Sequence, residues 1–454
     1  MRSITRIGLC SAFTFLWSVQ MALAVPYTGG TGPGGFILTG PASDLTMWLR
    51  GDQGITKDGL DQVSQWNDQS GRNNHVKQVT TLNQPLQNGT LNSVPVVRFD
   101  GGSQGANADF LITDGGLSAQ TILIVNRATG TPSQPNPILG NTTNYLSIRR
   151  SASSWDFPGN SDDFTFPTGT FRVNGATSTI STVNVAQQFA AERSSAFGFT
   201  RVQLARHNSG VPTLPERSFQ GDIGEVVMIN RALNNVERII VENSLSAKYD
   251  LPLSTGGGAL DLYAGDDPLQ GNYDSDVVGI GNNATNSVTN AGQSGFGIQV
   301  TEGSLGANEW VLAGHETPVN SIVTLDNASP DLVGSRWDRV WYVDKTETDG
   351  INATFGFDFE DAGLSAPLPG SSFQLLYSVD SNFTDGWQIL GETFTQSNGT
   401  VTFNLLNASL LDGYYTLGLN IAYVPEPNSL LLMLGVLGCG MLRRRRRIVA
   451  DQQA

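Results

Sequence analysis

Cysteine is nearly absent from this 454-residue sequence, which contains only Cys10 and Cys439, one near each end. The residues between them can form no disulfide framework, cysteine nucleophile or cysteine-based zinc site. Histidine is also scarce, and none of His75, His207 and His315 has a second histidine or a cysteine at ligand spacing. We therefore expect each histidine to be a surface or structural residue.

Basic residues are few compared with acidic ones. Residues 25–442 contain 19 Lys and Arg against 40 Asp and Glu, which gives a net charge of −21. A surface of this sign repels nucleic acid and anionic membranes, and it suits divalent cations or a saline setting. Nucleic acid is therefore not an expected partner.

Long runs of helix-forming residues are also missing, whereas glycine is abundant at 52 residues. Short apolar runs bounded by turn residues take their place, such as TILIV at Thr121–Val125, EVVMI at Glu225–Ile229 and PVVRFDGG at Pro95–Gly102. This pattern predicts an all-β protein built as antiparallel sandwiches.

One helix is predicted against this background, from about Asn235 to Tyr249. Asn234 followed by Glu237 has the spacing of a capping box. Apolar residues inside the segment recur at helical spacing and predict one packing face. They are Val236, Ile239, Ile240 and Leu245.

Residues 36–252 contain stretches that resemble a known family. They are DLTMWLRGDQGI (Asp44–Ile55), VSQWNDQSGRNNH (Val63–His75) with VPVVRFDGG (Val94–Gly102), and GDIGEVVMINRALNNVERIIVENSLSAKYDL (Gly221–Leu251). Together they resemble laminin-G-like domains of bacterial surface proteins. The resemblance implies a concanavalin-A-like jelly roll with one C-terminal helix. It implies little about function, because lectins, adhesins, glycosidases and spacers share that fold.

A second β-sandwich is expected over residues 261–423, after a flexible linker at 253–260. Phe355, Phe357 and Phe359 alternate as the inward face of a strand does. VVGIGNN (Val277–Asn283) and RWDRVWYV (Arg336–Val343) resemble an uncharacterised β-sandwich module of secreted bacterial proteins. That resemblance implies architecture alone.

The first 24 residues have the pattern of a secretory signal. A positively charged start and an apolar core at Leu9–Trp17 precede Ala22 and Ala24, which fit a signal peptidase site. We expect cleavage after Ala24 and a flexible leader over residues 25–35. A membrane anchor is the alternative, although the apolar core is short.

The C-terminal segment combines a proline motif, an apolar span and a basic cluster. These are Val424, Pro425, Glu426 and Pro427, then Ser429–Leu442, then Arg443, Arg444, Arg445, Arg446 and Arg447. As a helix the uncharged span is about 21 Å long, against roughly 30 Å of hydrocarbon, and snorkelling arginines can close that gap. A single transmembrane helix is therefore predicted, with the arginines and residues 448–454 in the cytoplasm.

This three-part order resembles the PEP-CTERM sorting signal of Gram-negative bacteria. The resemblance implies that an exosortase, a membrane transpeptidase, recognises and removes the segment. The chain would then cross the inner membrane, be held there transiently, and reach the cell surface or extracellular matrix. A plain tail anchor is the alternative.

Two oxygen-rich segments are candidate calcium sites. Asn272, Asp274 and Asp276 alternate as calcium-loop ligands do, although the glycine and glutamate positions of an EF-hand are not matched. The alternative is a polar turn before a strand.

The second candidate is the loop that contains Asn67 and Asp68, followed by Asn73 and Asn74. Its alternative is a set of Asx turns, which need no metal. Calcium is accordingly the one cofactor that the sequence suggests.

Catalytic motifs are weak. There is no G-x-S-x-G elbow, and Asp222 and Glu225 are three apart on one predicted strand, where they are expected on opposite faces.

Trp155 is the best candidate for an exposed, sugar-stacking tryptophan. The sequence therefore favours a non-catalytic role in an exopolysaccharide matrix, either carbohydrate binding and adhesion or a structural task. A polysaccharide hydrolase and a ligand-free spacer are the alternatives.

Overall fold

The computed structural model describes residues 31–419 with internal gaps. The predicted signal, sorting motif and cytoplasmic tail lie outside the described residues. Within the described ranges, no helix has the length and apolarity needed to cross a bilayer. The gaps are 102–107, 131–135, 144–146, 157–168, 207–217, 255, 257, 259, 302, 317–318, 326–333, 361–372, 385, 391–393 and 398.

The first β-sandwich consists of two antiparallel sheets of eight strands, and a short 3-10 turn, η1 (Thr81–Asn83), accompanies them. The first sheet contains β13 (Ala176–Thr177), β12 (Gly169–Val173), β14 (Ala186–Phe199), β8 (Leu117–Ala128), β16 (Gln220–Ile229), β6 (Val94–Asp100) and β5 (Leu86–Leu91), with β1 (Leu45–Arg50) also paired to β16. The second sheet contains β11 (Ser154–Asp156), β10 (Ser147–Ser151), β9 (Asn136–Asn141), β15 (Val202–Leu204), β7 (Leu111–Thr113), β4 (Val76–Lys77), β3 (Val63–Trp66) and β2 (Ile55–Lys57).

The second β-sandwich follows η2 (Ala264–Asp266) and has sheets of nine and five strands. The larger sheet contains β18 (Ser287–Val288), β17 (Ser275–Asn282), β21 (Glu309–His315), β24 (Trp341–Thr346), β30 (Gly413–Leu419), β23 (Ser335–Trp337), β22 (Ile322–Thr324), β26 (Phe373–Ser378) and β27 (Gln388–Leu390). The smaller sheet contains β19 (Asn290–Gln293), β20 (Phe296–Gln299), β25 (Ala353–Asp358), β29 (Thr400–Leu405) and β28 (Phe394–Ser397).

Each sandwich has its own apolar core between its sheets. In the first, Trp66 and Leu139 come from one sheet and Phe99 from the other. In the second, Phe355 and Phe357 are fully buried in one cluster, as their alternation predicts. The predicted all-β architecture with antiparallel sheets is confirmed, and every residue of the runs at 121–125 and 225–229 is buried.

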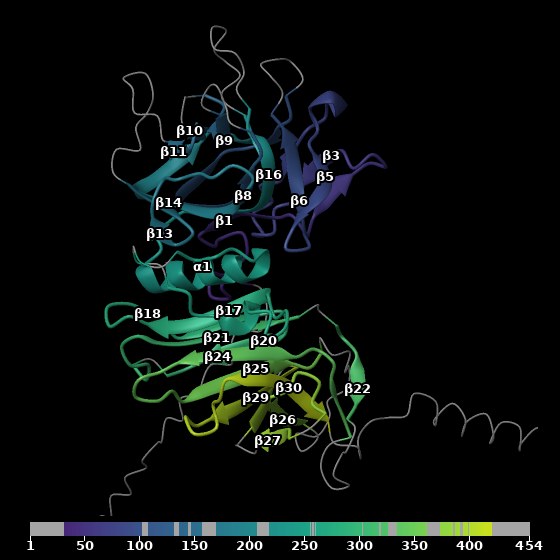
Figure 1. Ribbon diagram of the computed structural model, residues 1–454, viewed down its shortest axis with the longest axis vertical. Helices are drawn as coiled ribbons and strands as arrows, with labels where there is room; N and C mark the ends of the chain where they lie inside the picture. The colour runs from purple at the N-terminus through teal and green to yellow at the C-terminus, as the bar shows by residue number, and fades with distance from the viewer. Residues whose placement is uncertain are drawn as a thin grey trace, which may run out of the picture.

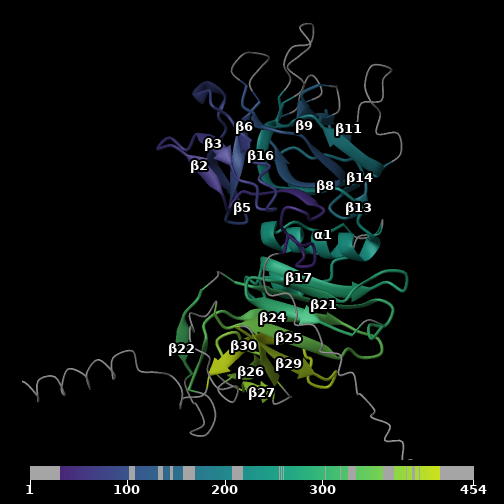
Figure 2. The same ribbon diagram turned by 180° about the vertical axis from the view of Figure 1, so that it is seen from behind.

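Helix α1 (Asn235–Tyr249) lies between the two sandwiches (Figures 1 and 2). Its predicted capping box is confirmed, because the Asn234 side chain accepts from the Glu237 N–H and the Glu237 carboxylate accepts from the Asn234 N–H. The predicted apolar stripe does not serve one surface. Val236 and Ile240 pack in the core of the second sandwich, whereas Leu245 packs on the outer face of the first. Helix α1 therefore packs against both sandwiches.

The glycine-rich segment before β1 also lies at this interface. Residues 31–35 were predicted as the end of a flexible leader, but they are buried and hydrogen-bonded. The Gly279 N–H donates to Gly34 O (3.1 Å), and the Gly292 N–H donates to Gly35 O (2.7 Å). Gly35 has a φ of 78°, and a Cβ there would lie 2.5 Å from Val278 Cγ1. Glycine is needed because the backbone passes so close to the second sandwich.

Candidate functional site

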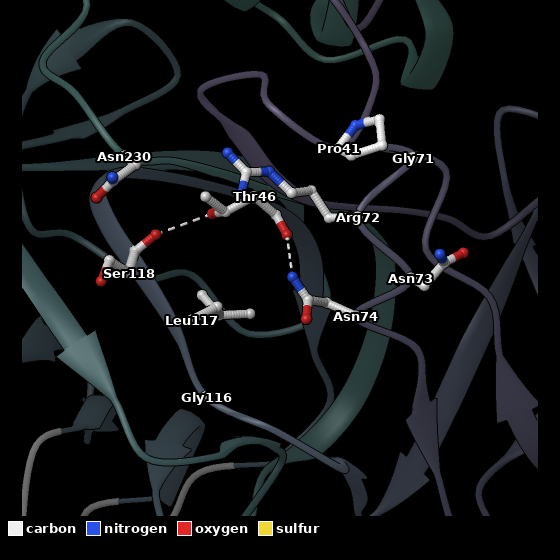
Figure 3. A pocket seen from close by; sticks show the side chains of 10 residues that line it. All are labelled: Pro41, Thr46, Gly71, Arg72, Asn73, Asn74, Gly116, Leu117, Ser118 and Asn230. Atoms are coloured by element: carbon white, nitrogen blue, oxygen red, sulfur yellow. Dashed lines mark hydrogen bonds between the residues drawn. The ribbon is translucent and has the colours of Figure 1, made fainter.

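A polar cavity of about 380 Å³ opens at one end of the first sandwich, where β1 and β8 begin and β16 ends (Figure 3). It is lined by Pro41, Thr46, Gly71–Asn74, Gly116–Ser118 and Asn230. This volume lies in the lower part of the range of small-molecule sites, roughly 300–1,000 Å³. The cavity therefore suits a small polar ligand or the end of a longer one. We refer to it as the rim pocket.

Asp68 organises the loop that forms one wall of the rim pocket. Its buried carboxylate accepts hydrogen bonds from the backbone N–H groups of Trp48 (2.8 Å), Ser70 (2.9 Å) and Asn74 (2.8 Å). The Ser70 hydroxyl donates a further bond (2.7 Å), and His75 Nδ1 accepts from the Asp68 N–H (3.0 Å). The carboxylate thus forms the side-chain-to-backbone hydrogen bonds that are typical of an Asx turn.

Side chains and close backbone contacts fasten this loop to the sandwich. Asn74 Nδ2 donates to Thr46 O (2.7 Å), and Thr46 Oγ1 donates to Ser118 O (2.9 Å), so the loop is tied to β1 and β8 (Figure 3). Gly71 has a φ of 81°, and a Cβ there would lie 2.8 Å from Gly40. The wall is consequently held in place without a ligand.

Three other side chains of the pocket retain bonding capacity. Asn73 and Asn230 are exposed, and their side-chain amides form no hydrogen bond within the described part of the chain. Arg72 is half-buried, and its Nη2 donates to Ser43 O. Amides both donate and accept, as hydroxyl groups do, and a guanidinium only donates. No aromatic residue is among the described residues that line the pocket, so polar contacts must carry recognition.

Asp222 and Glu225 share one face of β16, which contradicts the expectation from their spacing. Asp222 lies opposite Arg127 and Glu225 lies opposite Val125, two positions that share a face of β8. The register shifts between Ile223 and Glu225, so an additional residue, Gly224, reverses the alternation.

Neither carboxylate of this pair is free. Asp222 is fully buried and accepts hydrogen bonds from Arg98 Nε (2.8 Å) and Arg127 Nη2 (2.6 Å). The Glu225 carboxylate accepts from Trp48 Nε1 (2.6 Å) and Lys248 Nζ (2.7 Å). These two groups therefore do not form the acid and nucleophile of a glycosidase.

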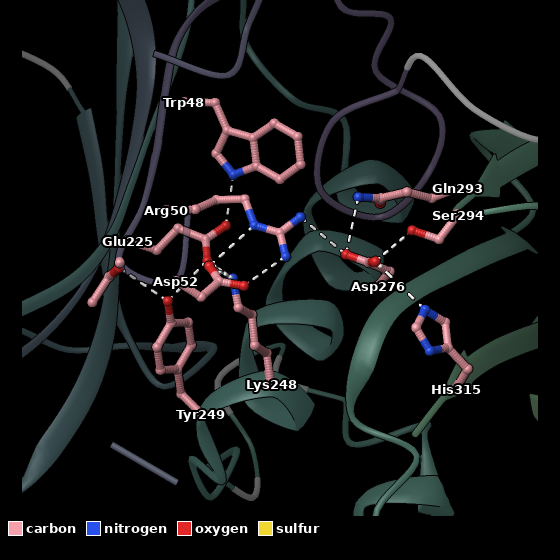
Figure 4. A network of polar contacts seen from close by, with 12 residues as sticks. Trp48, Arg50, Asp52, Glu225, Lys248, Tyr249, Asp276, Gln293, Ser294 and His315 are labelled. Atoms are coloured by element: carbon pink, nitrogen blue, oxygen red, sulfur yellow. Dashed lines mark hydrogen bonds and ion pairs between the residues drawn. The ribbon is translucent and has the colours of Figure 1, made fainter. Parts of the chain in front are cut away.

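Asp276, one of the predicted calcium ligands, lies in a polar cluster between the sandwiches (Figure 4). Its carboxylate is 3.0 Å from Arg50 Nη1, 3.2 Å from Gln293 Nε2 and 3.5 Å from His315 Nε2. Burial alone would raise the pKa of Asp276. The His315 ring beside it and the Arg50 charge outweigh burial and hold the pKa of Asp276 well below its usual range. The Asp276 carboxylate is therefore already paired with Arg50 of the same chain.

Arg50 connects that cluster to the first sandwich. Its Nη2 lies 2.9 Å from the Asp52 carboxylate, and Lys248 Nζ bridges Asp52 (3.0 Å) and Glu225 (2.7 Å) (Figure 4). Burial opposes ionisation of Asp52, but Lys248 and Arg50 together lower the pKa of Asp52 to about 2. Strand β1, helix α1 and strand β17 are therefore joined by one charged network.

The remaining predicted calcium ligands are placed as follows. The Asp274 carboxylate accepts from Asn92 Nδ2 (3.0 Å), and burial raises the pKa of Asp274 to about 6. Asn272 lies beside it in the turn before β17, and Asn67 lies next to Asp68 in the pocket wall. Within the described ranges, no group of three or more His, Cys, Asp or Glu side chains is arranged to hold a metal. Calcium binding stays a prediction.

Two further sequence interpretations can be compared with the structure. Trp155 is 2% exposed and its ring lies 4.8 Å from that of Phe189, so the expectation that it is exposed was wrong. The aromatic neighbours that cover it lie far away in the sequence. His315 is buried in the interface cluster, and His207 lies outside the described residues.

The comparisons with known proteins assign no family. No protein-family model matches the chain, and no curated protein matches it. The laminin-G-like and PEP-CTERM resemblances therefore stay predictions.

Solved structures show a distant similarity in β structure. A mutant of Trypanosoma rangeli sialidase displaying trans-sialidase activity aligns with 42% of this chain and 31% of its own, at 11% identity and a TM-score of 0.23. The same organism's sialidase in complex with 2,3-difluoro-KDN aligns with 52% of this chain and 37% of its own, at 13% identity and a TM-score of 0.26. A Paenibacillus sp. cycloisomaltooligosaccharide glucanotransferase complexed with cycloisomaltoheptaose aligns with 82% and 47%, at 10% identity and a TM-score of 0.17. Scores this low carry no argument about the function of this chain.

Proposed function

We propose that this chain is an exported, non-catalytic carbohydrate-binding protein of a bacterial cell surface or exopolysaccharide matrix. The observation that carries the binding proposal is the rim pocket, whose lining includes the exposed amides of Asn73 and Asn230, which have no hydrogen-bond partner within the described residues. We further propose that the first sandwich is a concanavalin-A-like jelly roll, because its two eight-stranded sheets enclose one core and helix α1 follows its closing strand.

The chemistry of the pocket supports a sugar ligand over an apolar one. A sugar ring presents hydroxyl groups in several directions, and each needs both a donor and an acceptor. Amide side chains supply both, and the fixed backbone of the loop limits the ordering cost of binding. Since the described lining of the pocket contains no aromatic residue, we expect modest affinity per site.

Binding is tested with a glycan array, probed with the full chain in the presence and absence of calcium. The pocket variants are Asn230→Ala and Asn73→Gly; glycine is chosen because Asn73 has a φ of 60°. We expect the wild-type chain to bind a subset of glycans and both variants to lose that signal. A blank array in both conditions would support the ligand-free spacer, and release of new reducing ends would support the hydrolase.

The export part of the proposal rests on the two terminal segments of the sequence. Signal peptidase would cut after Ala24, and an exosortase would remove the segment that carries Arg443–Arg447. Mass spectrometry of the mature protein from its native host tests both steps. We expect neither the signal nor the arginine cluster on the extracellular form, and an intact cluster there contradicts exosortase processing.

A further inference from the structure

We infer that the rim pocket prefers sugars that carry a carboxylate, such as uronic acids, and that Arg72 recognises this carboxylate. The inference rests on the proposed carbohydrate-binding function and specifies its ligand class. It follows from the charge of the pocket and from the unused bonding capacity of one guanidinium.

Among the described residues that line the pocket, Arg72 is the one charged residue. Its Nη2 donates to Ser43 O, whereas its Nε is buried and has no hydrogen-bond partner within the described residues. No carboxylate in the described ranges lies within ion-pair distance of Arg72. Two other arginines of the first sandwich differ: Arg50 pairs with Asp52 and Asp276, and Arg231 pairs with Asp44.

The described carboxylates near the pocket do not line it, and their bonds go to groups other than Arg72. Asp68 accepts from three backbone N–H groups and one hydroxyl, and Asp44 lies 3.3 Å from Arg231 Nε. Among the described residues that line it, the pocket carries one positive charge and no negative charge, in a chain whose residues 25–442 carry a net charge of −21. A cation in the wall of a polar cavity favours an anionic group on the ligand.

The shape of the guanidinium favours a carboxylate in particular. Its planar N–H groups match the two oxygens of a carboxylate, and such charge-assisted bonds are stronger than neutral ones. Asn73 and Asn230 line the same cavity on opposite sides of Arg72 (Figure 3), so their amides can bind hydroxyl groups on different rings of an oligosaccharide. A chain of uronates presents carboxylates and hydroxyl groups along its length.

The test compares trigalacturonate with its methyl ester by isothermal titration calorimetry on the full chain. Esterification removes the negative charge without altering the protein, so this arm does not depend on a variant folding. A sulfated galactotriose is the third ligand and separates a carboxylate preference from general attraction of anions. The variants are Arg72→Gln, Arg72→Lys and the charge-matched control Lys57→Gln, whose side chain is exposed and pairs with Asp61 away from the pocket.

We expect the wild-type chain to bind trigalacturonate about tenfold more tightly than the ester. Arg72→Gln should abolish this preference, so that the acid and the ester bind with equal affinity. Arg72→Lys should keep only part of it, because an ammonium lacks the planar fork, and Lys57→Gln should keep all of it.

Each contrary result has a distinct meaning. Equal binding of acid and ester, an unchanged preference in Arg72→Gln, or equal binding of the sulfated sugar overturns the carboxylate inference and leaves the proposed function intact. Binding of neutral glycans alone on the array would likewise overturn the carboxylate inference and leave the proposed function intact. If no glycan of any kind binds, the proposed function and this inference both fail.

Discussion

Replacing Asp276 by asparagine tests whether the two sandwiches are held together by the charged network around Arg50. The side chains of Asp276 and Arg50 are largely buried, with 13% and 8% of their surfaces exposed, and their charged groups lie 3.0 Å apart. Asparagine keeps the size of the side chain and tolerates the φ of 48° at this position. It removes the negative charge that faces Arg50.

The expected cost follows from the partners that remain. Breaking a buried ion pair by removing one charge costs about 3–5 kcal/mol. Arg50 retains Asp52, and the new amide can still bond Ser294 or Gln293, so we expect the lower end, about 3 kcal/mol. The matched control is Asp61→Asn, which breaks an exposed pair with Lys57 and should cost about 0–1 kcal/mol.

Urea unfolding followed by tryptophan fluorescence measures this difference, because Trp48 and Trp341 are buried in different sandwiches. The folded protein holds the pKa of Asp276 below its value in the unfolded chain. The contribution of this carboxylate is therefore complete above about pH 4 and is lost as the pH falls further. The reasoning is refuted if Asp276→Asn changes the free energy of unfolding no more than Asp61→Asn does.

Three other predictions concern the segments that shape the fold and the pocket. Gly35→Ala should lower the free energy of unfolding in chemical denaturation by about 2–4 kcal/mol, because the new Cβ meets Val278. The control Gly303→Ala has a similar φ of 80° but open space around it, and it should lower that free energy by about 1 kcal/mol. Equal effects of the two substitutions would contradict the close approach at Gly35. Asp68→Ala should lower the free energy of unfolding by about 3 kcal/mol and speed hydrogen exchange at the backbone amides of Ser70 and Asn74. Unchanged exchange at these amides would argue against the organising role of Asp68. Burial, helped by the Asp100 charge, raises the pKa of Asp109 to about 7, so the folded chain binds more protons than the unfolded chain between about pH 4 and 7. Stability should therefore fall as the pH rises through that window, and Asp109→Asn should flatten the slope in thermal unfolding; an unaltered slope would contradict the assignment.

Features governed by neighbouring residues were predictable from the sequence. The helix and its capping box depend on hydrogen bonds within one turn, and the strands depend on alternation over a few positions. The bulge in β16 was harder to predict, although Gly224 inside a strand pattern is a recognised signal for one. Counting positions without that bulge placed Asp222 and Glu225 on opposite faces.

Features that depend on distant contacts were not predictable from local patterns. The burial of Trp155 depends on Phe189, and the burial of residues 31–35 depends on the second sandwich. The rim pocket is assembled from five separated segments, and the pairing of β1 and β8 with β16 brings them together. The loop at 67–74 was recognised as oxygen-rich, and its Asx-turn alternative agrees with the hydrogen bonds that Asp68 accepts from the backbone of Ser70 and Asn74.

The most direct test of the binding account is a crystal structure of the protein soaked with trigalacturonate. We predict ligand density in the rim pocket, with a carboxylate facing Arg72 and hydroxyl groups within hydrogen-bond distance of Asn73 and Asn230. Ligand bound at another surface while the rim pocket stays empty would contradict the account.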